Sequence, residues 1–182
     1  MNCPVCKKPS LQLITLEDNL PANQCSNCKG IWVSANQYLA WVQLRKEPLP
    51  AKPLDDAAPQ LRTDSLKLCP ESGHIMKRFK VFPNVDFHLD RCGHCNGIWF
   101  DSSEWDMLAA HNMQDKVNQF FTAPWQAKLH EKESHAKMDS IYKDKLGAED
   151  YQRIQQIREW LDKNPRRAML IAFLQADDPF EV

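Results

Sequence analysis

The 182-residue sequence has no long apolar run, no excess of either charge and no basic leader. No stretch approaches the roughly 18 apolar residues of a membrane-spanning helix, so we expect no membrane contact. The net charge is −1, from 23 Lys and Arg against 24 Asp and Glu. This balance argues against the basic field of a typical DNA-binding domain. The N-terminal residues have neither the basic nor the apolar segment of a secretion signal, so we expect a cytoplasmic protein.

Candidate catalytic groups are also scarce. Apart from the cysteines and their immediate neighbours, no set of Cys, His, Asp or Glu side chains has the spacing of a metal site or an acid–base pair. His130 and His135 lie in a polar segment with Glu131 and Glu133, where solvated side chains are the simplest interpretation. We therefore expect a protein that is not an enzyme, with no catalytic residues and no organic cofactor.

The sequence contains a cysteine motif that occurs twice. Residues 25–32 read CSNCKGIW, and residues 92–99 read CGHCNGIW. Each of these segments has an upstream partner, which is CPVC at residues 3–6 for the first copy and CPESGH at residues 69–74 for the second. The four segments contain all seven cysteines of the chain.

Cysteine pairs in this arrangement are typical of tetrahedral zinc sites. A C-x2-C pair, about eighteen residues and a second C-x2-C pair is a zinc-ligand spacing. Four ligands close the coordination shell, as in a structural zinc site. We predict two zinc ions, with iron in a four-thiolate shell as the alternative metal. The predicted ligands are Cys3, Cys6, Cys25 and Cys28 in the first site and Cys69, His74, Cys92 and Cys95 in the second.

The fourth ligand of the second site is the least regular of the eight. Ser72 stands where the motif has its second cysteine, and His74 follows two residues later. Imidazole is an ordinary zinc ligand, so a site of three cysteines and His74 is chemically sound. His94 lies inside a two-residue knuckle, where we expect the side chain to point away from the metal. His88, on the predicted hairpin, is the remaining and less favoured alternative.

Each copy of the motif continues into a short strand and a helix start. The boxes Ser34–Gln37 and Asp101–Glu104 have an oxygen side chain at the N-cap and Gln or Glu three residues later. The predicted fold is small α+β. It consists of two tandem zinc ribbons, each an antiparallel β-hairpin plus a capped short helix, followed by an all-helical C-terminal region. The predicted domains are residues 1–45 and 67–111 for the ribbons, 46–66 for a proline-rich linker and 112–182 for the helical region.

The C-terminal region is predicted to contain three helices. The first ends before Gly147, the second carries Trp160 in its apolar stripe, and the third follows Asn164-Pro165 and carries Phe173. We expect the last two helices to form a hairpin that buries Trp160 against Phe173. Whether this region docks on the ribbons is left open by the sequence.

The repeated motif resembles the bacterial TFIIB-like zinc-finger family. The pattern of that family is approximately C-P-x-C, a hairpin, then C-x-x-C-G-G-I-W-[LF]-D-x-x-E-[LW], and the second copy keeps its Asp101, Glu104 and Trp105. The resemblance covers residues 1–44 and 67–111, about half of the chain. It implies a zinc-ribbon fold and zinc as the metal. The name of the family implies a transcriptional link by shape alone, and a fold does not carry a function.

These features predict an interaction module whose two structural zinc ribbons present a surface to a protein partner. The alternative is a nucleic-acid-binding or transcription-associated accessory factor that uses the second hairpin, where Lys77, Arg78 and Lys80 surround a phenylalanine. The near-neutral charge favours the protein partner. We expect Trp32 and Trp99 to cap the small ribbon cores beside the zinc. The sequence predicts no oligomeric state.

Overall fold

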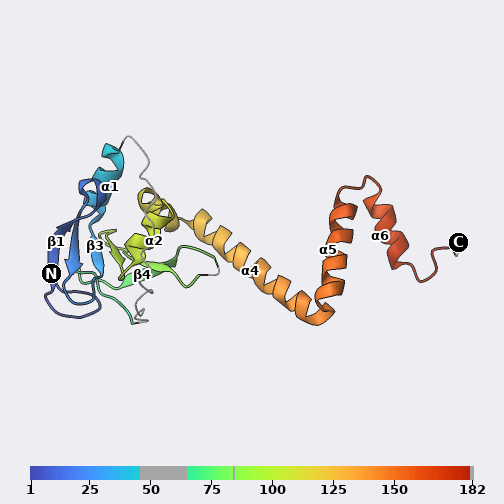
Figure 1. The fold of residues 1–182 in the computed structure, drawn as a ribbon, viewed down its shortest axis with the longest axis horizontal. Helices are drawn as coiled ribbons and strands as arrows, with labels where there is room; N and C mark the ends of the chain where they lie inside the picture. The colour runs from blue at the N-terminus through green and yellow to red at the C-terminus, as the bar shows by residue number, and fades with distance from the viewer. Residues whose placement is uncertain (46–64, 84, 181–182) are drawn as a thin grey trace. The chain divides into compact units, whose positions relative to one another are not determined.

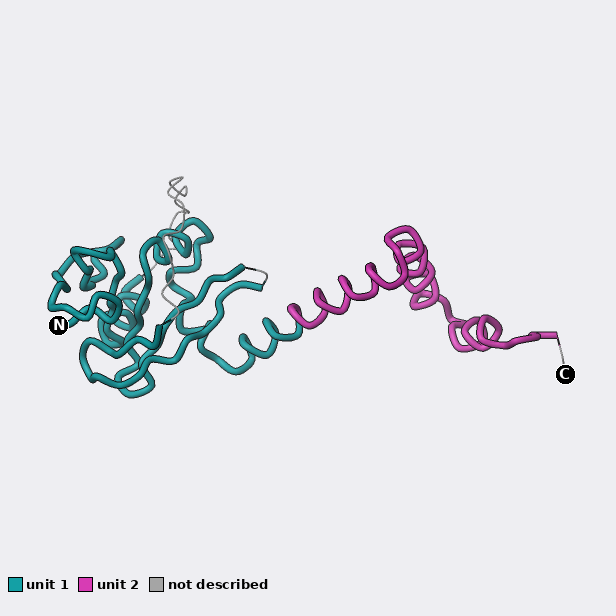
Figure 2. The backbone as a smooth tube through the Cα atoms, turned by 90° about the horizontal axis from the view of Figure 1, so that it is seen from below, with its two compact units in different colours: residues 1–131 teal, residues 132–182 magenta. Residues whose placement is uncertain are grey.

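The computed structural model describes residues 1–45, 65–83 and 85–180. The predicted linker, residues 46–66, therefore lies almost entirely outside the described residues. The chain divides into two units, Met1–Glu131 and Lys132–Val182 (Figure 2). No helix in the described parts of the chain has both the length and the apolar character needed to cross a membrane.

The first ribbon begins with the predicted hairpin. Strands β1 (Leu11–Thr15) and β2 (Pro21–Cys25) pair antiparallel, with Leu11 opposite Cys25. Asp18 and Asn19 adopt positive φ angles of 48° and 59° in the connection. Asn and Asp tolerate this left-handed conformation better than most residues, so the turn forms where the sequence places them.

The capped helix of the first ribbon follows a three-residue strand. β3 (Ile31–Val33) leads directly into α1 (Ala35–Leu44). The Ser34 hydroxyl accepts a hydrogen bond from the backbone N–H of Gln37 and lies 2.7 Å from its side-chain oxygen. The predicted capping residue at the start of this helix is therefore confirmed.

The second ribbon repeats this order with a different helix start. It contains β4 (Met76–Lys80), β5 (His88–Cys92), β6 (Ile98–Phe100) and α2 (Glu104–Ala110). The helix begins two residues later than predicted. Half of the predicted capping box forms, because Glu104 accepts a hydrogen bond from the backbone N–H of Asp101 at 2.7 Å. The Asp101 carboxylate itself does not cap the helix, since Trp99 Nε1 and a buried lysine use its two oxygens.

The two ribbons join into one sheet, although the sequence suggested two platforms spaced by a linker. β3 pairs antiparallel with β6, and the six strands follow the order β1-β2-β3-β6-β5-β4. Figure 1 labels β1, β3 and β4 of this sheet. Trp32 lies opposite Trp99 at the centre of this junction. Each ribbon alone would leave its third strand at an open edge, and the junction removes both edges at once.

A reciprocal contact between glycine and tryptophan holds the junction together. A Cβ atom on Gly30 would lie 2.2 Å from the Trp99 ring, and a Cβ atom on Gly97 would lie 2.2 Å from the Trp32 ring. Each tryptophan is fully buried against the glycine of the other copy. The glycine and tryptophan of the repeated Gly-Ile-Trp motif are thus explained by the packing of one repeat on the other.

The sheet carries different groups on its two faces. Ile31 and Val33 belong to the large aromatic and aliphatic core, whereas Trp32, between them, packs with the cysteines. This alternation is the period of two expected of a strand. The large core is shared by both repeats and by the segment after α2, which contributes Val117, Phe120 and Phe121. The Tyr38 hydroxyl also donates a hydrogen bond to the Gln114 carbonyl of this segment at 2.7 Å. The short elements η2 (Gln114–Lys116) and α3 (Val117–Phe120) lie in this segment.

The last three helices are α4 (Ala123–Leu146), α5 (Ala148–Asp162) and α6 (Arg167–Gln175). Gly147, with a φ of +78°, separates α4 from α5, which confirms the predicted stop. No side chain in the described part of the second unit, residues 132–180, is buried. Trp160 and Phe173 are each 53% exposed, so the predicted burial of one against the other is wrong. Three helices do form, but they have no core of their own.

Candidate metal centres

Four cysteines converge in the first ribbon. Cys3 and Cys6 come from the loop before β1, Cys25 ends β2, and Cys28 follows in the next turn. All four sulfur atoms lie within 4.8 Å of one another, with Cys3 to Cys28 at 3.5 Å and Cys25 to Cys6 at 3.8 Å. Tetrahedral zinc with Zn–S bonds of about 2.3 Å requires S–S separations of about 3.8 Å. The donor set therefore fits a closed four-thiolate zinc site.

Hydrogen bonds and burial give the Cys3 and Cys25 thiols of this site different pKa values. Burial opposes ionisation of Cys25, but the Ser10 hydroxyl at 3.0 Å and nearby backbone N–H groups outweigh it and lower its pKa to about 6. Burial raises the pKa of Cys3 to about 11. Asn27 donates a further hydrogen bond to the Cys6 sulfur at 3.2 Å. The first zinc site thus has donors around its sulfurs that help to hold the thiolate form.

Three cysteines converge in the second ribbon. The sulfurs of Cys69, Cys92 and Cys95 lie within 4.8 Å of one another. The Cys69–Cys95 separation is 3.5 Å, equal to that of Cys3 and Cys28. Burial opposes ionisation of Cys92, but hydrogen bonds from the Ser72 hydroxyl and the backbone lower its pKa to about 6. The corresponding cysteine, Cys25 in the first copy and Cys92 in the second, therefore has the lowered pKa in both sites.

The structure does not bring the predicted histidine ligand into this cluster. His74 is exposed, with Nδ1 3.1 Å from the Ser72 carbonyl oxygen, and its ring stacks on that of His94 at 4.5 Å. Neither imidazole joins the three sulfurs within 4.8 Å among the described residues. His88 lies 3.4 Å from Asp86 instead. Ligation by His74 remains a prediction that the geometry does not by itself support.

Comparison with known protein families agrees with this geometry. The family described as transcription factor zinc-finger, of the TFIIB zinc-ribbon type, matches residues 2–44 and residues 68–111. The chain carries two tandem TFIIB-type zinc ribbons. The two matched segments coincide with the repeats that surround the two cysteine clusters. No curated protein and no solved structure matches the chain.

The family and the two clusters together assign two zinc ions to the tandem ribbons. The first ion has a complete four-cysteine donor set, and the second has three cysteines. Each site lies on the face of the sheet that carries Trp32 and Trp99. Zinc thus supplies cross-links on the face of the sheet opposite the large aromatic core.

A buried charge network in the second ribbon was not predicted from the sequence. Lys67 is 1% exposed, and its ammonium group donates to Asp90 at 2.6 Å and to Asp101 at 2.7 Å. Arg78 approaches the other oxygen of Asp90 at 3.5 Å. Burial and the charge of Asp101 raise the pKa of the neighbouring Glu104 to about 8. The sequence signal of this network is a lysine two residues before the C-P motif, with Asp90 before the tryptophan strand and Asp101 and Glu104 after it.

The basic hairpin does not form a single cationic patch. Lys77 and Arg78 are adjacent on β4 and therefore lie on opposite faces of the sheet. Arg78 pairs with Asp90, and the Lys77 ammonium lies over the Phe79 ring at 5.1 Å. The charge available to a phosphate backbone is therefore smaller than the sequence run suggests.

Proposed function

We propose that this tandem zinc-ribbon protein is a non-enzymatic interaction module whose C-terminal helices dock on a protein partner. The observation that carries the proposal is the exposed apolar surface of the second unit. The exposed large side chains there are Met138, Tyr142, Leu146, Ile154, Ile157, Trp160, Met169, Phe173, Leu174 and Phe180.

The length of the helices supports a docking role. α5 has 15 residues and α6 has 9. Isolated helices of this size are marginally stable in water, and most helical stability comes from packing an apolar face. Because residues 148–180 bury no side chain of their own, packing against a partner would provide the missing stabilisation. Exposed apolar patches of this kind mark interaction sites in soluble proteins.

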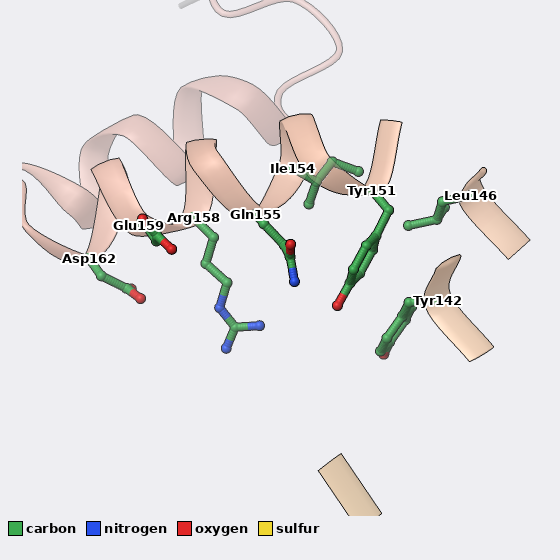
Figure 3. A pocket seen from close by; sticks show the side chains of 8 residues that line it. All are labelled: Tyr142, Leu146, Tyr151, Ile154, Gln155, Arg158, Glu159 and Asp162. Carbon is green, nitrogen blue, oxygen red and sulfur yellow. The ribbon is translucent and has the colours of Figure 1, made fainter. Parts of the chain in front are cut away.

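A groove between α4 and α5 offers a defined place for such packing. Figure 3 shows side chains from both helices around this cavity, which has a volume of about 430 Å³. Tyr142, Leu146 and Ile154 supply its apolar part, and the charged side chains that line it are Arg158, Glu159 and Asp162. Protein–protein interfaces combine apolar and polar groups in this way.

Hydrogen bonds hold the shape of this groove. The Tyr151 hydroxyl donates to the Asp139 carboxylate across the turn between the helices, and Lys143 pairs with the same carboxylate at 2.6 Å. These contacts lower the pKa of Asp139, with the hydrogen bond from Lys143 as the main cause. The groove is therefore set between two helices whose relation is fixed by side chains at the turn.

The nucleic-acid alternative receives less support, because Lys77 and Arg78 lie on opposite faces of β4 and Arg78 has an acidic partner. We propose no catalytic residue, and the two zinc ions have a structural role in this proposal. The protein is also proposed to act in the cytoplasm, where a reducing environment keeps cysteine ligands available for metal.

Partner capture by the full-length chain tests the proposed function. The variant Ile154→Glu/Ile157→Glu replaces two half-exposed apolar side chains of α5 with charge. Gln152→Glu/Gln156→Glu is the matched control, because it adds the same charge to exposed polar positions of the same helix. We expect capture by the control and at least a tenfold loss with the isoleucine variant, since the variant places two charges in an apolar interface where a hot-spot side chain contributes about 2 kcal/mol or more.

Zinc content and nuclease treatment complete this experiment. Both variants should keep the zinc content of the unsubstituted protein, because the second unit contains none of the cysteines. Capture should survive nuclease treatment. Equal capture by both variants, or capture that nuclease abolishes, would contradict docking of a protein on α5.

A further inference from the structure

The second zinc site contains a position that the sequence motif leaves without a cysteine. Ser72 takes the same place in its knuckle as Cys6 does in the first. The Ser72 backbone N–H points to the Cys69 sulfur at 3.4 Å, and the Cys6 N–H points to the Cys3 sulfur at 3.3 Å. The residue after each, Gly73 or Lys7, is left-handed, with φ of 71° and 57°.

The side chains of the two sites also correspond. The Cys6 and Cys25 sulfurs are 3.8 Å apart, and the Ser72 hydroxyl oxygen lies 3.3 Å from the Cys92 sulfur. The remaining two sulfurs of each site, Cys3 and Cys28 in the first and Cys69 and Cys95 in the second, are separated by 3.5 Å. The shorter oxygen–sulfur distance is that of a hydroxyl in place of a larger thiol. Ser72 therefore places its hydroxyl at the fourth corner of the second site.

His74 corresponds to a residue outside the coordination shell. Its carbonyl accepts a hydrogen bond from the Cys69 N–H at 2.8 Å, as the Lys8 carbonyl accepts from the Cys3 N–H at 2.9 Å. Both His74 and Lys8 are exposed. The backbone that makes this knuckle bond directs the position after the turn to solvent, and the His74 ring rests on His94.

We propose that the second zinc is held by three thiolates, with the Ser72 hydroxyl at the fourth position, and that this position accepts a thiolate from outside the chain. A neutral hydroxyl is a weaker zinc ligand than a thiolate, and soft thiolates are favoured ligands of zinc. Zinc sites with three protein ligands keep an exchangeable fourth position. Ser72 is half-buried and its neighbours Glu71, Gly73 and His74 are exposed, so a ligand can approach from solvent.

The exchange is a simple ligand substitution. The incoming thiol releases its proton to solvent and binds through sulfur, while the neutral Ser72 hydroxyl leaves the coordination position with its own proton. No electron is transferred and the zinc stays divalent. The first site lacks this reactivity, because Cys6 already supplies the fourth thiolate.

Cadmium NMR of the full-length, cadmium-loaded protein tests the proposal, because each site gives its own resonance and each added thiolate moves that resonance downfield. N-acetylcysteine amide should move one resonance of the unsubstituted protein to the four-sulfur position and leave the other in place. Ser72→Cys should show two four-sulfur resonances without added thiol and should not respond. His74→Ala should behave as the unsubstituted protein does.

Zinc transfer to a chelator gives a second measurement. One equivalent should leave the unsubstituted protein rapidly and one slowly, and Ser72→Cys should slow the rapid phase by about tenfold or more, since even an outer-shell partner changes metal affinity 10–100-fold. A cysteine-containing peptide that saturates the site at lower concentration than N-acetylcysteine amide identifies a protein cysteine as the ligand; equal affinity identifies a small thiol. Loss of metal in His74→Ala, or no response of the unsubstituted protein to either thiol, overturns the proposal.

Discussion

Replacing Gly97 by alanine should destabilise the junction between the two ribbons. The added methyl carbon would lie 2.2 Å from one atom and 2.4 Å from a second atom of the Trp32 ring. Trp32 is fully buried and cannot move without disturbing the cysteines that pack with it on the same face of the sheet. Overpacking a well-packed core costs about 1–3 kcal/mol and occasionally more, and we expect a value of about 3 kcal/mol here.

Gly93→Ala is the matched control for this substitution. Gly93 lies in the same knuckle, but an added Cβ would meet nothing within 4 Å, and its φ is not in the left-handed region. The control should therefore change the free energy of unfolding by less than about 1 kcal/mol, and in the stabilising direction, because alanine restricts the unfolded chain. The comparison separates the clash with tryptophan from the general effect of losing a glycine.

Guanidinium denaturation at one fixed free zinc concentration measures these differences, since zinc binding contributes to folding. A double-mutant cycle with Trp32→Ala isolates the contact: the cost of Gly97→Ala should fall to about zero once the ring is removed. If Gly97→Ala costs no more than Gly93→Ala, or costs the same with and without the Trp32 ring, the reciprocal glycine–tryptophan contact is not what joins the ribbons.

The other predictions concern the metal and the buried charges. Metal analysis should find close to two zinc equivalents per chain. Chelation should unfold the ribbons, since structural zinc contributes roughly 10 kcal/mol or more to folding. A measured content of one equivalent would contradict the second zinc site. Lys67→Met should destabilise the protein by about 3–5 kcal/mol in denaturant titrations, because two carboxylates lose their buried partner. The control Lys77→Met, at an exposed position, should change the free energy of unfolding by less than about 0.5 kcal/mol. The pKa of Glu104 is raised from 4.5 to about 8, so the folded state binds more protons and stability falls as the pH rises between these values. Glu104→Gln should reduce this dependence, and an unchanged slope would show that Glu104 does not titrate as the structure indicates.

Much of the local structure follows from short-range chemistry in the sequence. The cysteine spacing, the turn at Asp18-Asn19, the cap at Ser34 and the stop at Gly147 each depend on a few neighbouring residues. The structure forms each of these features where the sequence predicts it. The α+β class and the two zinc ribbons were predictable for the same reason, because a ribbon is a local fold held by its own metal.

The sequence predicted four ligands for the second site, and the structure brings three of them, all cysteines, together. Counting residues favoured His74, because histidine is the nearest chemically suitable group after Cys69. Its orientation depends on the left-handed turn at Gly73 and on the backbone bond between Cys69 and His74. This turn and this hydrogen bond direct the His74 ring to solvent and place Ser72 next to Cys92. Neither feature can be read from the residue types alone.

The sequence by itself determined the seven cysteine ligands, the two ribbons and the helices of the C-terminal region, because all of these rest on spacing within one repeat or one helix. Only the tertiary structure decided that β3 pairs with β6, that Trp32 covers Gly97 while Trp99 covers Gly30, and that Lys67 lies between two aspartates. It also decided that Trp160 and Phe173 stay exposed. The physical reason is that these contacts join residues far apart in the sequence. A strand edge or an apolar side chain can pack on any surface that fits it, and the composition of a local segment does not specify which distant surface that is.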